Sequence, residues 1–198
     1  MTTSITVGFA AFCLANGVDP DRMSAVLAEA YSADGERGQG LVASVETGQI
    51  SGQEFDRRLA EALSVGLPEP LNPLDLSARL FGTLVPEPRM TGMVEAARRG
   101  GLKTGLISNT WGVRPPPESH ALFDVVVLSG REGIRKPDPE IYLLTAGRLG
   151  VPPEACVFVD DIPANVDGAR EVGMAALLHR DPAITIRKLE TLFDVALS

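Results

Sequence analysis

The chain has 198 residues, of which 44% are hydrophobic and 22% are charged, an ordinary composition for a globular protein. This length suits one sizeable core with a small extra lobe. The formal net charge of −8 disfavours nucleic acid and anionic membrane surfaces as main partners. It leaves room for a small phosphorylated ligand, because a local cation can override the global field.

The two cysteines, Cys13 and Cys156, lie far apart in apolar runs and match no metal-ligand spacing. They are expected to be reduced core residues of a cytoplasmic protein. The longest apolar stretch near the start, residues 7–15, is too short to span a bilayer. No basic residue precedes it, which argues against a signal peptide.

The first part of the chain has helical periodicity and no strand pattern before residue 100. Phe9, Phe12 and Cys13 recur at helical spacing, and Asp19 followed by proline is typical of a helix start. The sequence SGQE at 51–54 is a capping box that opens a further helix. The predicted helices begin near residues 4, 20, 51 and 74. This part therefore predicts a helical lobe.

From about residue 85 onward, strands and helices alternate. The predicted strands span 103–107, 125–128, 156–159 and 174–178, and the predicted helices span 88–99, 139–149, 163–172 and 182–193. Such alternation implies right-handed βαβ units and a parallel sheet. We therefore predict an α/β fold in which a Rossmann-like core carries the helical lobe.

Asp160 and Asp161 form a carboxylate pair directly after the predicted strand at 156–159. In open α/β sheets, ligands bind in the crevice at the carboxyl ends of the strands. Paired carboxylates there suit a hard cation such as Mg²⁺. A solvated turn with two capping aspartates is the alternative interpretation.

Two further segments carry residues suited to an anion. Ser108 and Asn109 follow the predicted strand at 103–107, where a hydroxyl and exposed amides can hold a phosphate oxygen, or simply form a turn. Lys136 lies in a loop that Pro137 and Pro139 make rigid, so its ammonium group is aimed, although most single surface lysines are only solvated. The order of these features along the chain makes the set more specific than any member.

This set resembles the haloacid dehalogenase superfamily of hydrolases. The resemblance is carried by LISNTWG at 106–112, GIRKPDPEIY at 133–142 and VFVDDIPANVDGAREVGM at 157–174, and it runs from near Met1 to about residue 180. It looks closest to phosphatase-like members, including the amino-terminal phosphatase domain of soluble epoxide hydrolases. In that family a helical cap is inserted after the first strand. The resemblance thus implies a cap at 9–85 and a core formed by 1–8 and 86–198.

The resemblance also implies a role for each site residue. Ser108 is similar to the hydroxyl that binds the transferring phosphoryl group, with Asn109 contributing a backbone amide. Lys136 resembles the lysine that neutralises phosphate. Asp161 resembles a Mg²⁺ ligand with Asp160 as its partner. Asn165 is expected to brace this loop from outside the ligand shell.

The chain departs from the family at the first motif, an amino-terminal strand that ends in Asp-x-Asp or Asp-x-Gly-Gly. The first Asp of that motif is the covalent nucleophile. This chain begins Met-Thr-Thr-Ser, similar to the segment after the motif, and its earliest carboxylate is Asp19. We therefore expect a sheet without its usual central first strand and a chain without its nucleophile. Three situations fit: a longer native protein, a strand supplied by a second chain such as a homodimer partner, or a rearranged and inactive protein.

The leading functional hypothesis is a Mg²⁺-dependent phosphatase that acts on a small phosphomonoester by an aspartyl-phosphate route. The first alternative is an inactive protein of the same fold that binds phosphate, metal or a partner. The second is a haloacid dehalogenase, which needs no metal, so the Asp160–Asp161 pair argues against it. The substrate is not identified: Trp111, after the phosphate loop, either lines a pocket or packs under the cap.

Overall fold

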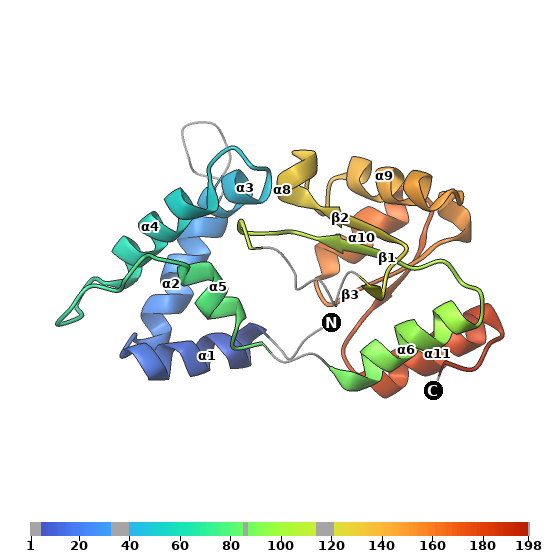
Figure 1. Cartoon of the computed structure of the whole chain (residues 1–198), viewed down its shortest axis with the longest axis horizontal. Coiled ribbons are helices and arrows are strands. Elements are labelled where there is room, and N and C mark those ends of the chain that lie inside the picture. Colours follow the sequence, from blue (N-terminus) through green and yellow to red (C-terminus); the bar gives the residue numbers. More distant parts are fainter. Residues whose placement is uncertain (1–4, 33–39, 85–86, 114–120, 198) are drawn as a thin grey trace. The chain divides into compact units, whose positions relative to one another are not determined.

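The computed structural model describes residues 5–32, 40–84, 87–113 and 121–197, which form two compact units (Figure 1). The helical unit contains residues 5–32, 40–84 and, from later in the chain, residues 110–113. The α/β unit contains residues 87–109 and 121–197. Each unit has its own hydrophobic core. None of the described helices is long and apolar enough to cross a membrane.

The helical unit has helices α1 (Ile5–Asn16), α2 (Pro20–Tyr31), α3 (Leu41–Glu46), α4 (Gly52–Leu63) and α5 (Leu76–Phe81). Capping side chains start two of them as predicted. The Asp19 carboxylate accepts a hydrogen bond from the Asp21 amide at 2.8 Å, and the Ser51 hydroxyl accepts one from the Glu54 amide at 3.1 Å. The described residues before 100 contain no strand, which confirms that prediction for this part of the chain.

Apolar side chains at helical spacing form the core of the helical unit. Phe55, Leu59 and Leu63 lie on one face of α4 and are fully buried. The rest of this core comes from α4 itself, the other helices, the connection between α1 and α2, and the late segment 110–113: Phe9, Phe12, Cys13, Val18, Met23, Val26, Ala30, Val42, Val45, Ala60, Leu76, Leu80 and Trp111. The buried position of Cys13 agrees with its prediction as a core thiol.

The α/β unit follows the predicted alternation. Its elements are α6 (Pro88–Arg99), β1 (Gly105–Ser108), β2 (Val125–Leu128), α8 (Ser129–Glu132), α9 (Pro139–Leu149), a 3₁₀ turn (Pro153–Ala155), β3 (Val157–Asp160), α10 (Pro163–Glu171), β4 (Ala175–Leu178) and α11 (Pro182–Phe193). The Asp138 carboxylate caps α9 by accepting from the Glu140 amide at 2.9 Å. Gly150 ends α9 at φ 67°, a conformation that favours glycine.

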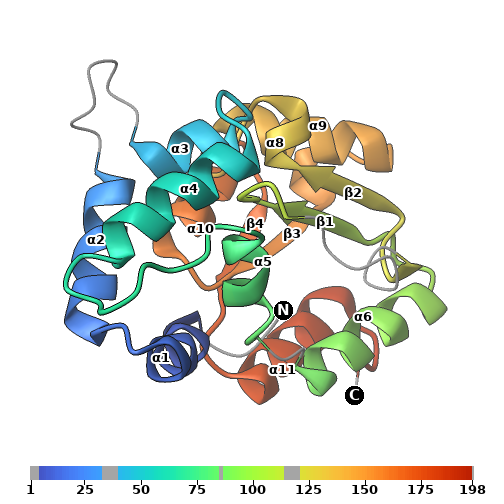
Figure 2. The same cartoon turned by 60° about the vertical axis from the view of Figure 1, so that its left-hand side comes forward.

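Helices cover both faces of the strands in this unit (Figures 1 and 2). Helix α9 packs on β1 and β2, α10 packs on β3 and β4, and α6 packs against α11. Side chains of β3 alternate between two cores: Val157 and Val159 join the core under α6 and α11, and Phe158 joins the core under α9 and α10. This alternation is typical of a strand buried between two helical layers.

The strands are parallel, which confirms the predicted α/β fold class, but they form two separate pairs. β1 pairs with β2, with Ser108 opposite Leu128, and β3 pairs with β4, with Asp160 opposite Leu178. Among the described residues, no strand pairs with the second edge of β1 or of β3.

The two units differ in extent from the predicted cap and core. Residues 5–8 continue α1 into the helical unit because they belong to one unbroken helix, whereas they had been assigned to the core. Residues 110–113 also join the helical unit. Residues 1–4, 85 and 86, which the prediction divided between cap and core, lie outside the described residues.

Candidate active site

Two of the predicted site residues are the last residues of strands in the α/β unit. Ser108 ends β1 and Asp160 ends β3. Lys136 lies in the loop between α8 and α9. This is the strand end at which open α/β folds bind ligands.

Asn109 connects the end of β1 to the lysine loop through its side chain. Its Oδ1 accepts a hydrogen bond from the Lys136 amide at 2.9 Å, and its Nδ2 donates to the Lys136 carbonyl at 3.0 Å. The sequence had suggested only a backbone amide from Asn109. In the structure its carboxamide also fixes the backbone of Lys136.

Lys136 and Asp160 form a buried ion pair. The Nζ atom of Lys136 lies 2.7 Å from Oδ2 of Asp160, and the two side chains are 12% and 7% exposed. The ammonium group also lies 5.7 Å from the centre of the Phe158 ring, within the range of a cation–π contact. An ion pair with this little exposure holds both side chains in place.

Asp160 accepts further hydrogen bonds that keep it ionised. Its Oδ1 accepts from the Ile162 amide at 2.9 Å and from Nδ2 of Asn165 at 3.1 Å. Burial alone would raise the pKa of Asp160, but the charge and hydrogen bond of Lys136 and these two donors outweigh it. The pKa of Asp160 therefore lies below its ordinary value.

Further contacts support the residues around the Lys136–Asp160 ion pair. The Tyr142 hydroxyl donates to the Asn165 carbonyl at 2.8 Å, and burial raises the pKa of Tyr142 well above its ordinary value. Gly168 on α10 lies so close to the lysine loop that a Cβ there would sit 2.5 Å from the Pro137 carbonyl oxygen. Asn165 thus contacts the loop that it was expected to brace, whereas neither Tyr142 nor Gly168 was singled out from the sequence.

Asp161 and Ser108 have fewer contacts than Lys136 and Asp160. Asp161 is exposed, and its carbonyl accepts from Nη1 of Arg180 at 3.0 Å. Ser108 is half-buried, and within the described part of the chain its hydroxyl has no hydrogen-bond partner. The structure thus joins Asn109, Lys136, Asp160 and Asn165 through contacts. Ser108 and Asp161 adjoin this network as chain neighbours of Asn109 and Asp160.

The carboxylates present fit a magnesium ion that takes few protein ligands. Mg²⁺ usually keeps several waters and binds one or two carboxylates together with substrate phosphates. Asp161 offers an exposed carboxylate, and Asp160 beside it is engaged by Lys136. Across the described ranges, no group of three or more His, Cys, Asp and Glu side chains could hold a metal ion. Any ion here would therefore depend on water and a bound phosphate for its remaining ligands.

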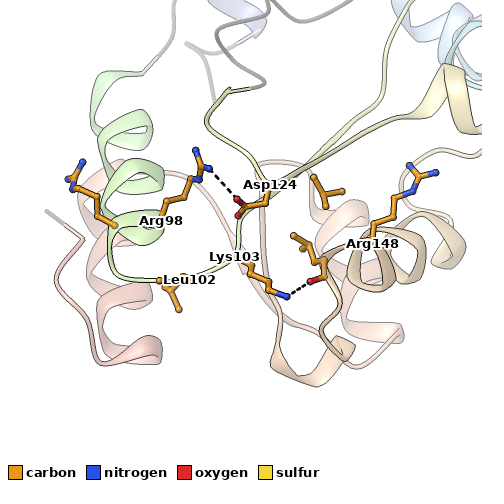
Figure 3. A pocket seen from close by; sticks show the side chains of 9 residues that line it. Arg98, Leu102, Lys103, Asp124 and Arg148 are labelled. Atoms are coloured by element: carbon orange, nitrogen blue, oxygen red, sulfur yellow. Dashed lines mark hydrogen bonds and ion pairs between the residues drawn. The ribbon is translucent and has the colours of Figure 1, made fainter.

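A shallow cavity of about 620 Å³ lies at the opposite, amino-terminal ends of β1 and β2 (Figure 3). Its basic side chains have structural partners. Lys103 donates to the Leu149 carbonyl at 2.7 Å at the end of α9, and Arg98 pairs with Asp124 at 3.2 Å. Arg148, in the last turn of α9, pairs with Glu132 at 2.7 Å. Cations near helix carboxyl ends stabilise them, so this cavity is explained without a ligand.

The sequence is similar to a known protein family and to proteins of known name. Residues 13–173 match the family described as haloacid dehalogenase-like hydrolase. The chain is 31% identical to bifunctional epoxide hydrolase 2 of Sus scrofa over 191 residues, which is 86% of this chain and 33% of that protein. It is 38% identical to phosphatase MT3486 of Mycobacterium tuberculosis over 142 residues, which is 69% of this chain and 64% of that protein. The chain thus spans between a third and two thirds of these relatives.

The fold is also similar to that of a solved HAD-family enzyme from Bacteroides thetaiotaomicron, crystallised with magnesium and inorganic phosphate. The TM-score is 0.60 at 19% identity, covering 90% of this chain and 86% of that one. At this identity the likeness shows the fold alone. Because the family match covers most of the sequence and the fold agrees with it, the chain belongs to the haloacid dehalogenase-like hydrolases.

Proposed function

We propose that the α/β unit carries a Mg²⁺-dependent phosphatase site for a small phosphomonoester. The observation that carries the proposal is the buried Lys136–Asp160 ion pair, which lies beside the exposed Asp161 at the end of β3. The mycobacterial relative is named a phosphatase, which supports the same chemistry.

Charge explains why a metal ion is needed. Lys136 and Asp160 neutralise each other, so the Asp161 carboxylate is the charge that a phosphate meets at the end of β3, with Arg180 on the Asp161 carbonyl as a neighbouring positive charge. A phosphate dianion about 4 Å from the Asp161 carboxylate would be repelled by roughly 4 kcal/mol per pair of unit charges near a protein surface. A divalent cation on Asp161 would turn this repulsion into attraction. When bound, such an ion polarises a phosphoryl oxygen as a Lewis acid.

The residues of this chain would bind and orient the phosphate. The Lys136 ammonium has three N–H donors, one of which is used by Asp160, so two remain for phosphate oxygens. The Ser108 hydroxyl would donate to another oxygen. Asn109 and Asn165 hold the lysine loop and Asp160 in place. Phosphoryl transfer depends mainly on such positioning and charge neutralisation.

The aspartyl-phosphate route needs one more carboxylate, in line with the phosphorus atom. None of the residues matched to the family's motifs supplies it. We therefore expect the 198-residue chain to bind phosphate and turn over almost nothing. The same expectation favours a second candidate, a non-catalytic phosphate-binding protein of this fold.

Calorimetric titration with inorganic phosphate tests the binding site. We expect binding in Mg²⁺ that is lost in EDTA, and at least about a tenfold loss of affinity in Lys136→Met, because a charge-assisted hydrogen bond contributes about 1.5–3 kcal/mol. Asp161→Asn should lose the Mg²⁺ dependence. Lys103→Met, at the opposite strand ends, is the matched control and should bind like the wild type. A wild-type chain that binds no phosphate contradicts the proposal.

Turnover of p-nitrophenyl phosphate separates the two candidates. Hydrolysis by the chain that disappears in Asp161→Ala would show a nucleophile within these 198 residues and decide for an enzyme. No hydrolysis together with Mg²⁺-dependent phosphate binding would favour the binding protein. Metal-independent release of halide from a haloacid would instead favour a dehalogenase.

A further inference from the structure

The chain crosses from the α/β unit to the helical unit directly after the candidate phosphate loop. Asn109 belongs to the α/β unit, and residues 110–113 belong to the helical unit. Two consecutive residues span at most about 7 Å between Cα atoms, so Trp111 cannot move far from Asn109. If the residues on both sides of this crossing are fixed, the loop between them is therefore fixed as well.

On the helical side, Trp111 is held by packing and by a hydrogen bond. It is 3% exposed, and its ring centre lies 5.0 Å from those of both Phe55 and Phe81. Its indole Nε1 donates to Oε1 of Glu46 at 3.1 Å, and Glu46 itself is 3% exposed. A donor and an acceptor this deeply buried are costly to separate, so the indole fixes the backbone of this segment.

A close backbone approach fixes the next residue as well. Gly112 has φ 78°, and a Cβ built there would lie 2.7 Å from Cα of Gly52, the first residue of α4. A Cβ at Gly52 would in turn lie 3.1 Å from Cα of Gly112 and 3.3 Å from the Trp111 carbonyl oxygen. The segment 110–113 is thus held at two points: the Trp111 side chain is buried in the helical core, and the Gly112 backbone lies against Gly52.

On the α/β side, Asn109 is held by its two hydrogen bonds to the Lys136 backbone. The loop that carries Ser108 therefore has one anchor in each unit, separated only by Thr110. We propose that Trp111 is a positioning residue, which couples the packing of the helical unit to the placement of Asn109 and Lys136. Its effect on phosphate rests on the proposed function, whereas its effect on the Lys136 backbone does not.

Amide hydrogen exchange tests the coupling without any ligand. In Trp111→Phe, which keeps an aromatic ring but removes the indole donor, we expect the Lys136 amide to exchange about fivefold faster. The Val127 amide, in β2 of the same unit, should stay within about twofold of the wild type. Gly52→Ala, which pushes on the clamped backbone, should have the same effect on Lys136.

Val26→Ala is the matched control, because Val26 lies in the same helical core on α2. It should lower the Tm and leave Lys136 exchange unchanged. Glu46→Gln keeps an oxygen acceptor for the indole and should retain wild-type exchange at Lys136. If Trp111→Phe lowers only the Tm, as Val26→Ala does, then Trp111 is merely a core residue and the proposal is wrong.

The effect on phosphate gives a second readout. Trp111 is the only tryptophan of the chain, so its fluorescence reports on this segment alone. Phosphate with Mg²⁺ should change the emission of the wild type, and Lys136→Met should abolish that change. A wild type that binds phosphate by calorimetry with unchanged emission contradicts the coupling. A wild type that binds none contradicts the proposed function and leaves the exchange result to decide the coupling.

Discussion

Asn109 and Lys136 are joined by two hydrogen bonds of opposite direction, from one carboxamide to both polar groups of one residue's backbone. The contact joins β1 to a loop 27 residues later in the chain. The lysine is thereby aimed by a neighbouring strand as well as by the flanking prolines that drew attention to it in the sequence.

Asn109→Ala should destabilise the protein by about 1–3 kcal/mol, because it leaves an amide and a carbonyl of the half-buried Lys136 without their partner. Urea unfolding measures this change. Asn72→Ala is a matched control: the Asn72 carboxamide caps an exposed turn by accepting from the Leu74 amide at 2.9 Å. It should cost less than about 0.5 kcal/mol. If both variants lose the same free energy of unfolding, then the two Asn109–Lys136 hydrogen bonds contribute nothing specific to stability.

Lys136→Met should destabilise the protein by about 3 kcal/mol, because it leaves the Asp160 carboxylate buried without its counter-charge. The double variant Lys136→Met/Asp160→Asn removes the stranded charge and should recover part of that loss. Thermal or urea unfolding of the two single variants and the double variant gives the coupling energy. Strictly additive losses would contradict a direct interaction.

Stability should fall in acid because the pKa of Asp160 is lower in the folded chain than in the unfolded chain. A carboxyl group of this kind stabilises the fold above its unfolded pKa, about 3.9, and loses this contribution as pH falls through the folded pKa. The difference in unfolding free energy between wild type and Asp160→Asn should therefore be largest near pH 7 and shrink below about pH 4. Urea unfolding at pH 7, 4 and 3 measures it; a constant difference would contradict this origin.

Gly168→Ala should destabilise the protein by about 1–3 kcal/mol, since the new methyl group would meet the Pro137 carbonyl oxygen at 2.5 Å. Gly147→Ala, on the exposed side of α9 with nothing within 4 Å of the new atom, should stabilise it by about 0.5–1 kcal/mol. The two Tm values should therefore move in opposite directions. In Gly168→Ala the displaced lysine loop should also weaken phosphate binding, which the Gly147 variant should leave unchanged.

Most of the fold was predictable because its elements carry strong local signals. Asp138 before Pro139 marks the start of α9, and Gly150 marks its end. A run of three valines placed Val125–Leu128 without error. Helices α3 and α8 were missed: α3 starts without a capping side chain, and α8 has four residues and no apolar side chain. The first strand begins two residues later than predicted, and just before it the Thr104 amide donates to the Asp124 side chain at 2.8 Å.

The contacts of the candidate site could be predicted only in part from the sequence. Lys136 and Asp160 stand out in sequence by charge and by flanking prolines, and the structure brings them together. The role of Gly168 depends on how closely α10 approaches another loop, and no local pattern encodes that distance. Trp111 had two interpretations, and the structure places it in the helical core. The cytoplasmic location and self-association stay predictions.

The division of the strands into two pairs has a practical consequence for handling the protein. Each strand, β1 and β3 included, has one row of backbone amides and carbonyls that no described strand covers. Such uncovered rows recruit extended segments from other molecules. Preparations of this chain should therefore form larger species as the concentration rises, and an added peptide able to run alongside β1 and β3 should suppress that clustering. Light scattering across a dilution series would record both effects.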